Sequence, residues 1–180
     1  MSTIQFIALS IFGLIVNIVL IIPFILLIWR FVIRPMIYPN PIRKYKYKDC
    51  YAIVTGASEG VGRSYAKYLA KEGFNLIIIA RRKELLNSLK EEIENEYHIK
   101  VIIIDVDLCD DNNFKRIEEE MKDKNITVLV NNAGKSIHDY FEKFEISEIN
   151  KVIKLNISAT NMMTRLFIEN TKQFVNTHKH

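Results

Sequence analysis

The segment from Ile4 to Trp29 contains no charged residue, and it constrains the chain more than any other feature. A helix needs roughly 20 apolar residues to cross the hydrocarbon core of a bilayer, so this segment is long enough to span it. A cleaved signal peptide would have a basic start, a shorter apolar core and a small-residue cleavage site, and this segment has none of them. The sequence therefore predicts a transmembrane anchor over residues 1–33, kinked at Pro23.

A basic stretch follows the apolar segment. The charged residues before Asp49 are all basic: Arg30, Arg34, Arg43, Lys44, Lys46 and Lys48. Lys and Arg beside a membrane span favour the cytoplasmic side and attract anionic lipid. Pro35, Pro39 and Pro41 are expected to end the helix and to make residues 34–49 a stiff linker.

Residues 50–180 are expected to form the folded domain. The chain has 25 Lys and Arg and 21 Asp and Glu, and because six of the basic residues precede Asp49, the domain itself is slightly acidic. A nucleic-acid-binding protein would carry basic charge on its folded body, so no nucleic acid partner is expected. The two cysteines, Cys50 and Cys109, have no metal-ligand spacing, and the sequence predicts no metal site.

A strand–turn–helix–strand pattern opens this domain. Residues 51–55 predict a short buried strand, a glycine-rich turn follows, and Gly73 is placed to end the next helix. Residues 74–80 are apolar on both faces, as in a central strand of a parallel sheet. The apolar side of the helix is predicted to consist of Val61, Tyr65, Tyr68 and Leu69. The pattern indicates a βαβ unit.

The turn in this unit has the spacing Gly56-x-x-x-Gly60-x-Gly62. Gly56 allows the tight turn, Gly60 allows close approach of a pyrophosphate, and Gly62 lets the helix pack near the strand. The helix N-terminus adds free N–H groups for a phosphate. A glycine turn without a ligand is the less favoured alternative, because this turn lies between a predicted strand and a predicted helix. The cofactor-binding residues predicted here are Gly56, Ser58, Glu59, Gly60, Val61 and Gly62.

The end of the second strand indicates which dinucleotide binds. NAD-binding folds usually place an acidic side chain there to accept a hydrogen bond from the ribose 2′-hydroxyl. Here Arg81 and Arg82 follow the strand instead, and arginine suits a 2′-phosphate. The alternative is that both arginines merely begin the helix 83–97, whose inward residues are predicted to be Leu85, Leu86, Leu89 and Ile93. The sequence favours NADP as the cofactor.

Two further strands follow. Residues 101–106 and 127–130 predict the third and fourth strands, and residues 112–121 predict a helix between them, with Phe114, Ile117 and Met121 facing inward. This alternation predicts an α/β fold of Rossmann type, a doubly wound parallel sheet represented by its first four strands. Because the fourth strand then exposes an edge, the chain alone is expected to be marginally stable. Another Rossmann-type enzyme, such as a methyltransferase, is a competing interpretation.

Two motifs resemble the short-chain dehydrogenase/reductase family: Thr55-Gly56-x-x-x-Gly60-x-Gly62, and Asn131-Asn132-Ala133-Gly134 at the end of the fourth strand. The resemblance covers roughly residues 50–175, about the first half of the family domain. It implies that Asn132, Ala133 and Gly134 contact the cofactor. It also implies that Asp107 reaches the adenine, with Asp105 as the competitor if the register is shifted by two.

The same resemblance predicts a catalytic role for Asn156. Residues 149–171 predict a long helix, and Lys154-Leu155-Asn156-Ile157 is similar to the family segment whose active-site Asn helps to hold a water in a proton relay. The alternative is an Asn that is hydrogen-bonded for structure alone. The family's catalytic pair, Tyr-x-x-x-Lys, is missing, since none of the eight tyrosines is followed by Lys four residues later. We therefore expect cofactor binding without the tyrosine that donates a proton to the carbonyl oxygen.

Taken with the anchor, the glycine turn looks most like one subgroup: the very-long-chain 3-oxoacyl-CoA reductases of the endoplasmic reticulum and the related 17β-hydroxysteroid dehydrogenases. This resemblance implies NADPH-dependent reduction of a 3-keto group on a long-chain acyl-CoA or a steroid. It implies a location in the endoplasmic reticulum membrane with the domain facing the cytoplasm, and a homodimer or fatty-acid elongation proteins as partners. The competing hypothesis is a non-catalytic, membrane-tethered nucleotide-binding protein.

Overall fold

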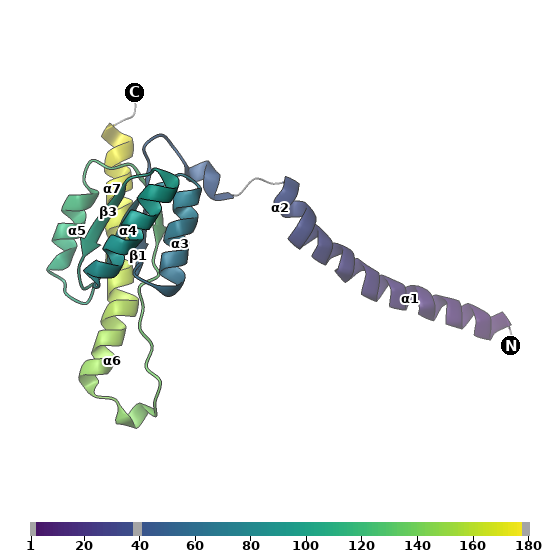
Figure 1. Ribbon diagram of the computed structural model, residues 1–180. Helices are drawn as coiled ribbons and strands as arrows, with labels where there is room; N and C mark the ends of the chain where they lie inside the picture. The colour runs from purple at the N-terminus through teal and green to yellow at the C-terminus, as the bar shows by residue number, and fades with distance from the viewer. Residues whose placement is uncertain (1–2, 38–40, 178–180) are drawn as a thin grey trace. The chain divides into compact units, whose positions relative to one another are not determined.

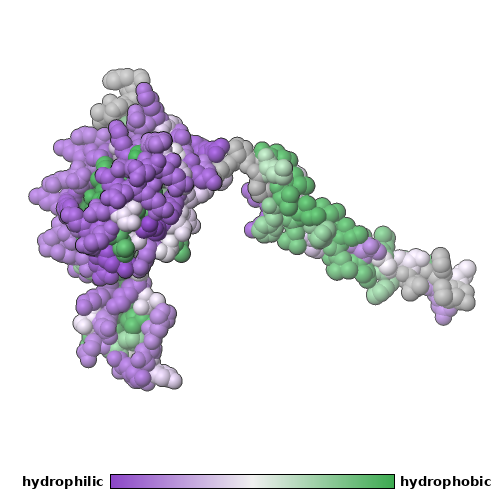
Figure 2. All heavy atoms as spheres, viewed as in Figure 1, coloured by the Kyte–Doolittle hydropathy of each residue, from purple (hydrophilic) through white to green (hydrophobic). Residues whose placement is uncertain are grey.

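The computed structural model describes residues 3–37 and 41–177, in two compact units, Met1–Lys44 and Tyr45–His180. In the first unit, helix α1 (Thr3–Ile28), which contains Pro23, continues through a π turn, η1 (Trp29–Ile33), into α2 (Arg34–Ile37) (Figure 1). Large apolar side chains are exposed along α1 (Figure 2). By length and composition alone, Thr3–Ile33 is a helix that is able to cross a membrane.

Pro35 does not end this helix, which corrects the prediction for the first of the three linker prolines. In the π turn that precedes it, the N–H of Arg34 donates to the carbonyl of Trp29, five residues back. Proline has no backbone N–H to donate, and the π turn is where the regular i→i−4 hydrogen bonding of the helix changes. Pro39 lies outside the described residues, and Pro41 begins a short 3₁₀ helix, η2 (Pro41–Tyr45).

A parallel four-stranded sheet forms the centre of the second unit. Its strands are β1 (Tyr51–Thr55), β2 (Asn75–Ala80), β3 (Val101–Asp105) and β4 (Ile126–Val130), in the spatial order β3-β2-β1-β4. They are connected by α3 (Gly60–Lys71), α4 (Lys83–Tyr97) and α5 (Asn113–Met121). The two central strands, β1 and β2, are buried almost throughout. The predicted Rossmann-type parallel sheet is therefore confirmed.

A long helix follows β4 and covers part of the sheet. Its parts are α6 (Ile146–Ile153), a π turn, η4 (Lys154–Ala159), and α7 (Thr160–Thr177), and a 3₁₀ turn, η3 (Phe141–Lys143), precedes it. This helix extends beyond the predicted residues 149–171 at both ends. The apolar periodicity of the sequence does not predict the π turn. α7 packs on β4 and α5, whereas α3 and α4 pack on each other and on β1, β2 and β3 (Figure 1).

The buried face of α3 differs from the prediction. Val61 is 65% exposed and Tyr65 is 47% exposed, so neither faces the sheet. The buried residues of α3 are Gly62, Ala66, Leu69 and Ala70, of which only Leu69 was predicted. Small side chains let the helix approach the strands closely, and tyrosines keep their hydroxyl groups in water. Prediction was better for α4 and α5, where the inward residues are as expected except for the half-buried Leu85.

Candidate functional site

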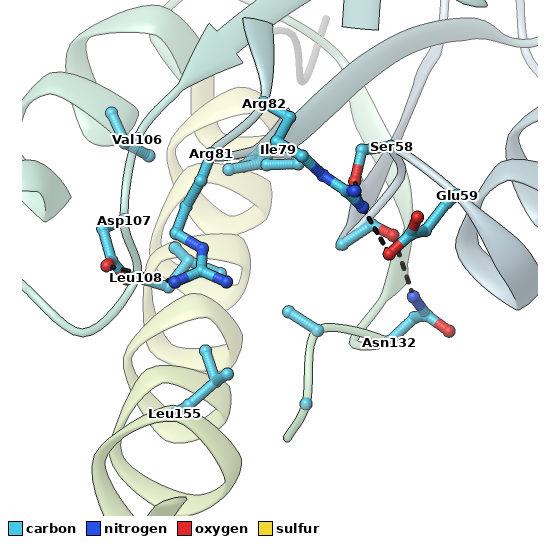
Figure 3. Close-up of a pocket in the computed structure, with 14 residues that line it drawn as sticks. Ser58, Glu59, Ile79, Arg81, Arg82, Val106, Asp107, Leu108, Asn132 and Leu155 are labelled. Carbon is cyan, nitrogen blue, oxygen red and sulfur yellow. Dashed lines mark hydrogen bonds and ion pairs between the residues drawn. The ribbon is translucent and has the colours of Figure 1, made fainter. Parts of the chain in front are cut away.

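A cavity of about 480 Å³ lies at the carboxyl ends of the strands (Figure 3). Ligands of open parallel sheets bind at this edge. The cavity is lined by nine of the predicted site residues: Gly56, Ser58, Glu59, Arg81, Arg82, Asp107, Asn132, Ala133 and Gly134. The other lining residues are Ile79, Ala80, Val106, Leu108 and Leu155. The predicted residues that do not line it are Gly60, Val61, Gly62 and Asn156.

The glycine turn is held close to the end of β4. Gly56 has a φ of +66°, and a Cβ at this position would lie 2.9 Å from the Cα of Ala133. A Cβ on Gly62 would overlap the carbonyl oxygen of Gly56 and the side-chain amide of Asn132. These two glycines are therefore required by the close approach of α3, the turn and β4.

Thr55 fastens the end of β1 to the residues that follow β4 by hydrogen bonds, and this role was not predicted from the sequence. Its side chain is almost completely buried, and its hydroxyl donates to the carbonyl of Val130 at 3.3 Å. The same hydroxyl accepts from the backbone N–H groups of Asn132 and Ala133, both at 3.0 Å. In return, the side-chain amide of Asn132 donates to the carbonyl of Thr55 at 3.0 Å and to that of Gly56 at 3.3 Å. A polar residue ending an otherwise apolar strand was the available signal.

Two ion pairs border the cavity beyond the end of β2 (Figure 3). Arg81 lies with its Nη1 atom 3.8 Å from Oδ2 of Asp107. Arg82 pairs with Glu59, and its Nη2 atom also donates to the hydroxyl of Ser58 at 3.4 Å. Both arginines therefore reach the cavity rather than merely beginning α4, and each has an acidic partner there.

Asp107 and Asp105, the two register alternatives, lie in different surroundings. Asp107 lines the cavity, and Asp105 does not. The carboxylate of Asp105 instead accepts from Arg116 at 2.8 Å and lies 3.5 Å from Nζ of Lys83. The hydrogen bond from Arg116 holds the pKa of Asp105 below its usual value of 3.8, although partial burial acts in the opposite direction. Asp105 thus belongs to an ion-pair cluster with Lys83 and Arg116.

Asn156 lies in the π turn of the long helix, outside the cavity lining. Its side-chain oxygen accepts from the N–H of Lys135, and its side-chain amide donates to the carbonyl of Lys135, both at 2.9 Å. Both polar ends of the side chain therefore hold the loop after Gly134 in place. This geometry favours the structural alternative for the side chain, and the catalytic role stays a prediction.

The N-terminal end of α3 is suited to binding a phosphate group. Glu59 is the N-cap residue of α3, but its side chain makes no capping hydrogen bond. The first N–H groups of the helix thus remain available to an anion. A Cβ on Gly60 would meet nothing within 4 Å, so there is open space before the helix. Ile79, Val106 and Leu108 give the far side of the cavity an apolar surface suited to a flat ring.

Comparison with known proteins agrees with this geometry. The family described as short chain dehydrogenase matches residues 51–177. A very-long-chain 3-oxoacyl-CoA reductase of Kluyveromyces lactis is 43% identical over 156 residues, which cover 83% of this chain and 45% of the relative. One of Candida glabrata is 36% identical over 166 residues, covering 88% of this chain and 47% of the relative. The chain thus spans less than half the length of these two relatives.

A solved structure with the same fold contains a dinucleotide. The short-chain dehydrogenase from Sphingobium yanoikuyae in complex with NADPH is 30% identical, with a TM-score of 0.63. The match covers 71% of this chain and 50% of that one. With a matching family over most of the second unit, a glycine turn fastened to the Asn132–Gly134 segment and a cavity at the carboxyl edge of the sheet, this chain belongs to the short-chain dehydrogenase family.

Proposed function

We propose that this chain forms the cofactor-binding part of a membrane-tethered, NADPH-dependent oxidoreductase. The observation that carries the proposal is the pair Arg81 and Arg82 at the cavity, where an NAD-binding fold would usually have an acid. Guanidinium groups form bidentate, charge-assisted hydrogen bonds with phosphate, and these are about twice as strong as neutral ones. A 2′-phosphate on the adenosine ribose is the group of NADP that such a site recognises.

The chemistry of the proposed reaction is hydride transfer from the nicotinamide to a keto carbon. In this proposal, the glycine turn and the N-terminus of α3 hold the pyrophosphate, Asp107 contacts the adenine, and Asn132–Gly134 orient the nicotinamide half. None of the eight tyrosines is followed by Lys four residues later, so the family's proton donor is not among these residues. We therefore expect the 180-residue chain to bind NADPH and to show no turnover of a 3-keto substrate.

The substrate part of the proposal is reduction of a 3-keto group on a long-chain acyl-CoA or a steroid. It is supported by the two relatives described as very-long-chain 3-oxoacyl-CoA reductases, the first of them 43% identical. Fatty-acid elongation proteins or a second copy of the chain are partners in the same proposal. Measurable turnover of a 3-oxoacyl-CoA by this chain alone would show that another residue serves as the proton donor.

The proposed location is the endoplasmic reticulum membrane, with the second unit in the cytoplasm. The apolar helix Thr3–Ile33 supports the anchor, and six basic residues between Arg30 and Lys48 support the orientation. Protease protection in microsomes tests it. The domain should be digested without detergent, and digestion that requires detergent would reverse the orientation.

The cofactor is tested by calorimetric titration of the full chain, in detergent micelles, with NADPH and with NADH. We expect tighter binding of NADPH, and we expect Arg81→Asp to weaken it about tenfold or more, corresponding to about 1.4 kcal/mol or more. Lys115→Asp makes the same change in charge at an exposed position of α5 outside the cavity and serves as the control. Unchanged NADPH affinity in Arg81→Asp would refute the assignment of that residue.

A further inference from the structure

An ion pair between Glu59 and Arg82 connects the N-termini of helices α3 and α4. Glu59 is the N-cap residue of α3, and Arg82 is the N-cap residue of α4. Neither side chain caps its own helix. An acidic side chain at an N-cap commonly accepts from the first N–H groups of its helix. Here the carboxylate of Glu59 points instead to the guanidinium group of Arg82 at the mouth of the cavity (Figure 3).

This arrangement occupies one of the two terminal nitrogens of Arg82. Its Nη2 nitrogen carries two hydrogen atoms. One contact of this nitrogen is with Oε1 of Glu59, and the other is with the hydroxyl of Ser58 at 3.4 Å. A phosphate that binds Arg82 through Nη2 must displace Glu59, and one that binds through Nη1 or Nε lies beside a carboxylate of the same charge. That repulsion acts on a 2′-phosphate and not on a 2′-hydroxyl.

We infer that Glu59 is a cofactor-specificity residue, which competes with the 2′-phosphate for Arg82 and lowers the preference for NADPH over NADH. The inference rests on the proposed function, because it assumes that the cavity binds a dinucleotide. A carboxylate is also the group that accepts a hydrogen bond from an unphosphorylated ribose. Glu59 is a carboxylate at the same cavity, so the inference includes a hydrogen bond from such a ribose to Glu59.

The exposure of the pair argues against a role in stability alone. The side chains of Arg82 and Glu59 are 49% and 67% exposed. Ion pairs this exposed contribute little to folding, because water and salt screen them. Removing the carboxylate should therefore leave the fold intact and change the relative affinity for the two cofactors.

Calorimetric titration of the full chain in detergent micelles, with NADPH and NADH, tests the inference. Glu59→Gln should tighten NADPH binding by about three- to tenfold, the size expected for releasing an exposed charge pair and removing one repulsion. NADH affinity should stay the same or weaken. Glu91→Gln, an equal change of charge at an exposed position of α4 outside the cavity, should leave the ratio of the two affinities unchanged.

A double variant shows whether the effect passes through Arg82. In the Arg82→Gln background, Glu59→Gln should no longer tighten NADPH binding. A gain that persists there would indicate a general charge effect and would overturn the inference, as would an unchanged ratio in the single variant. If the wild-type chain binds neither cofactor while its thermal melt is cooperative, the proposed function fails. If it binds NADPH but Glu59→Gln has no effect, only the inference fails.

Discussion

The two sides of the cavity are built in different ways. On one side, the glycine turn and the Asn132–Gly134 segment are joined by backbone contacts and by the buried hydroxyl of Thr55. On the other side, Arg81 and Arg82 extend from β2 as exposed side chains, and Arg82 reaches Glu59 of the glycine turn. Hydrogen bonds to buried groups hold the first, fixed side, whereas the second, adjustable side consists of exposed side chains.

This difference corresponds to what each side would recognise. The pyrophosphate is common to NAD and NADP, and a fixed backbone surface at a helix N-terminus suits it. The 2′-phosphate distinguishes the two cofactors, and charged side chains on the adjustable side suit that choice. Substitutions on the fixed side should therefore alter stability and binding of both cofactors, and those on the adjustable side should alter mainly their ratio.

The largest effect is expected from Gly62→Ala. A Cβ there would overlap the carbonyl oxygen of Gly56 and the amide of Asn132, so the turn must move. Overpacking of this kind costs about 1–3 kcal/mol of stability, and NADPH and NADH should weaken together. Denaturant unfolding and calorimetric titration measure both effects. Gly13→Ala is the control, since a Cβ at that position meets nothing within 4 Å. Unchanged stability would mean that α3 does not approach the turn so closely.

Thr55→Val should have the second-largest effect on stability and cofactor binding. Valine has nearly the same shape, but it leaves the N–H groups of Asn132 and Ala133 without their acceptor, which costs about 1–3 kcal/mol. The variant should unfold at lower denaturant concentration and bind both cofactors more weakly. Thr127→Val is the matched control on β4, because the Thr127 hydroxyl is buried and has no hydrogen-bond partner among the described residues. Equal losses in both variants would refute the fastening role of Thr55.

Asn156→Ala should have a smaller effect. It removes the two hydrogen bonds to the backbone of Lys135, which are exposed and together contribute about 1 kcal/mol. Amide hydrogen exchange at Lys135 should become faster, with little change in the core strands. Asn161→Ala, at an exposed position of the same helix, controls for the higher helix propensity of alanine. Slow exchange at Lys135 in the variant would show that Asn156 does not hold the loop.

The smallest effect is expected from Asp105→Asn, outside the cavity, and it should depend on pH. Because Arg116 lowers the pKa of Asp105 in the folded chain, this carboxylate stabilises the fold at neutral pH, where it is ionised in both states. The contribution, below about 1 kcal/mol for a partly exposed pair, is lost as pH falls below 3.8 through the lower folded pKa. The difference in unfolding free energy between wild type and variant should shrink from pH 7 to pH 3. Asp123→Asn, the same substitution at an exposed position, is the control. A difference in unfolding free energy between wild type and Asp105→Asn that stays constant with pH would contradict the ion-pair explanation.

Local patterns in the sequence predicted some faces of the helices and not others. For α5, Phe114, Ile117 and Met121 are the large apolar residues of a polar helix, and they are buried as expected. For α3, Gly62 and Ala66 carry a weak hydrophobic signal, but they are buried because the helix lies close to the strands. Apolar periodicity detects large side chains that require burial. It does not detect small ones that permit close approach.

By itself, the sequence determined the apolar N-terminal segment, the strand–helix alternation, the positions of the glycines and the replacement of an acid by Arg81 and Arg82. These features depend on residue type and on local periodicity. Only the tertiary structure decided that Thr55 fastens Asn132 and that Glu59 meets Arg82. The physical reason is that β1 lies next to both β2 and β4 and parallel to them, so the carboxyl ends of these strands bring together side chains that are far apart along the chain. Which of those side chains then pair depends on the strand register and on side-chain rotamers, and the local sequence pattern predicts neither.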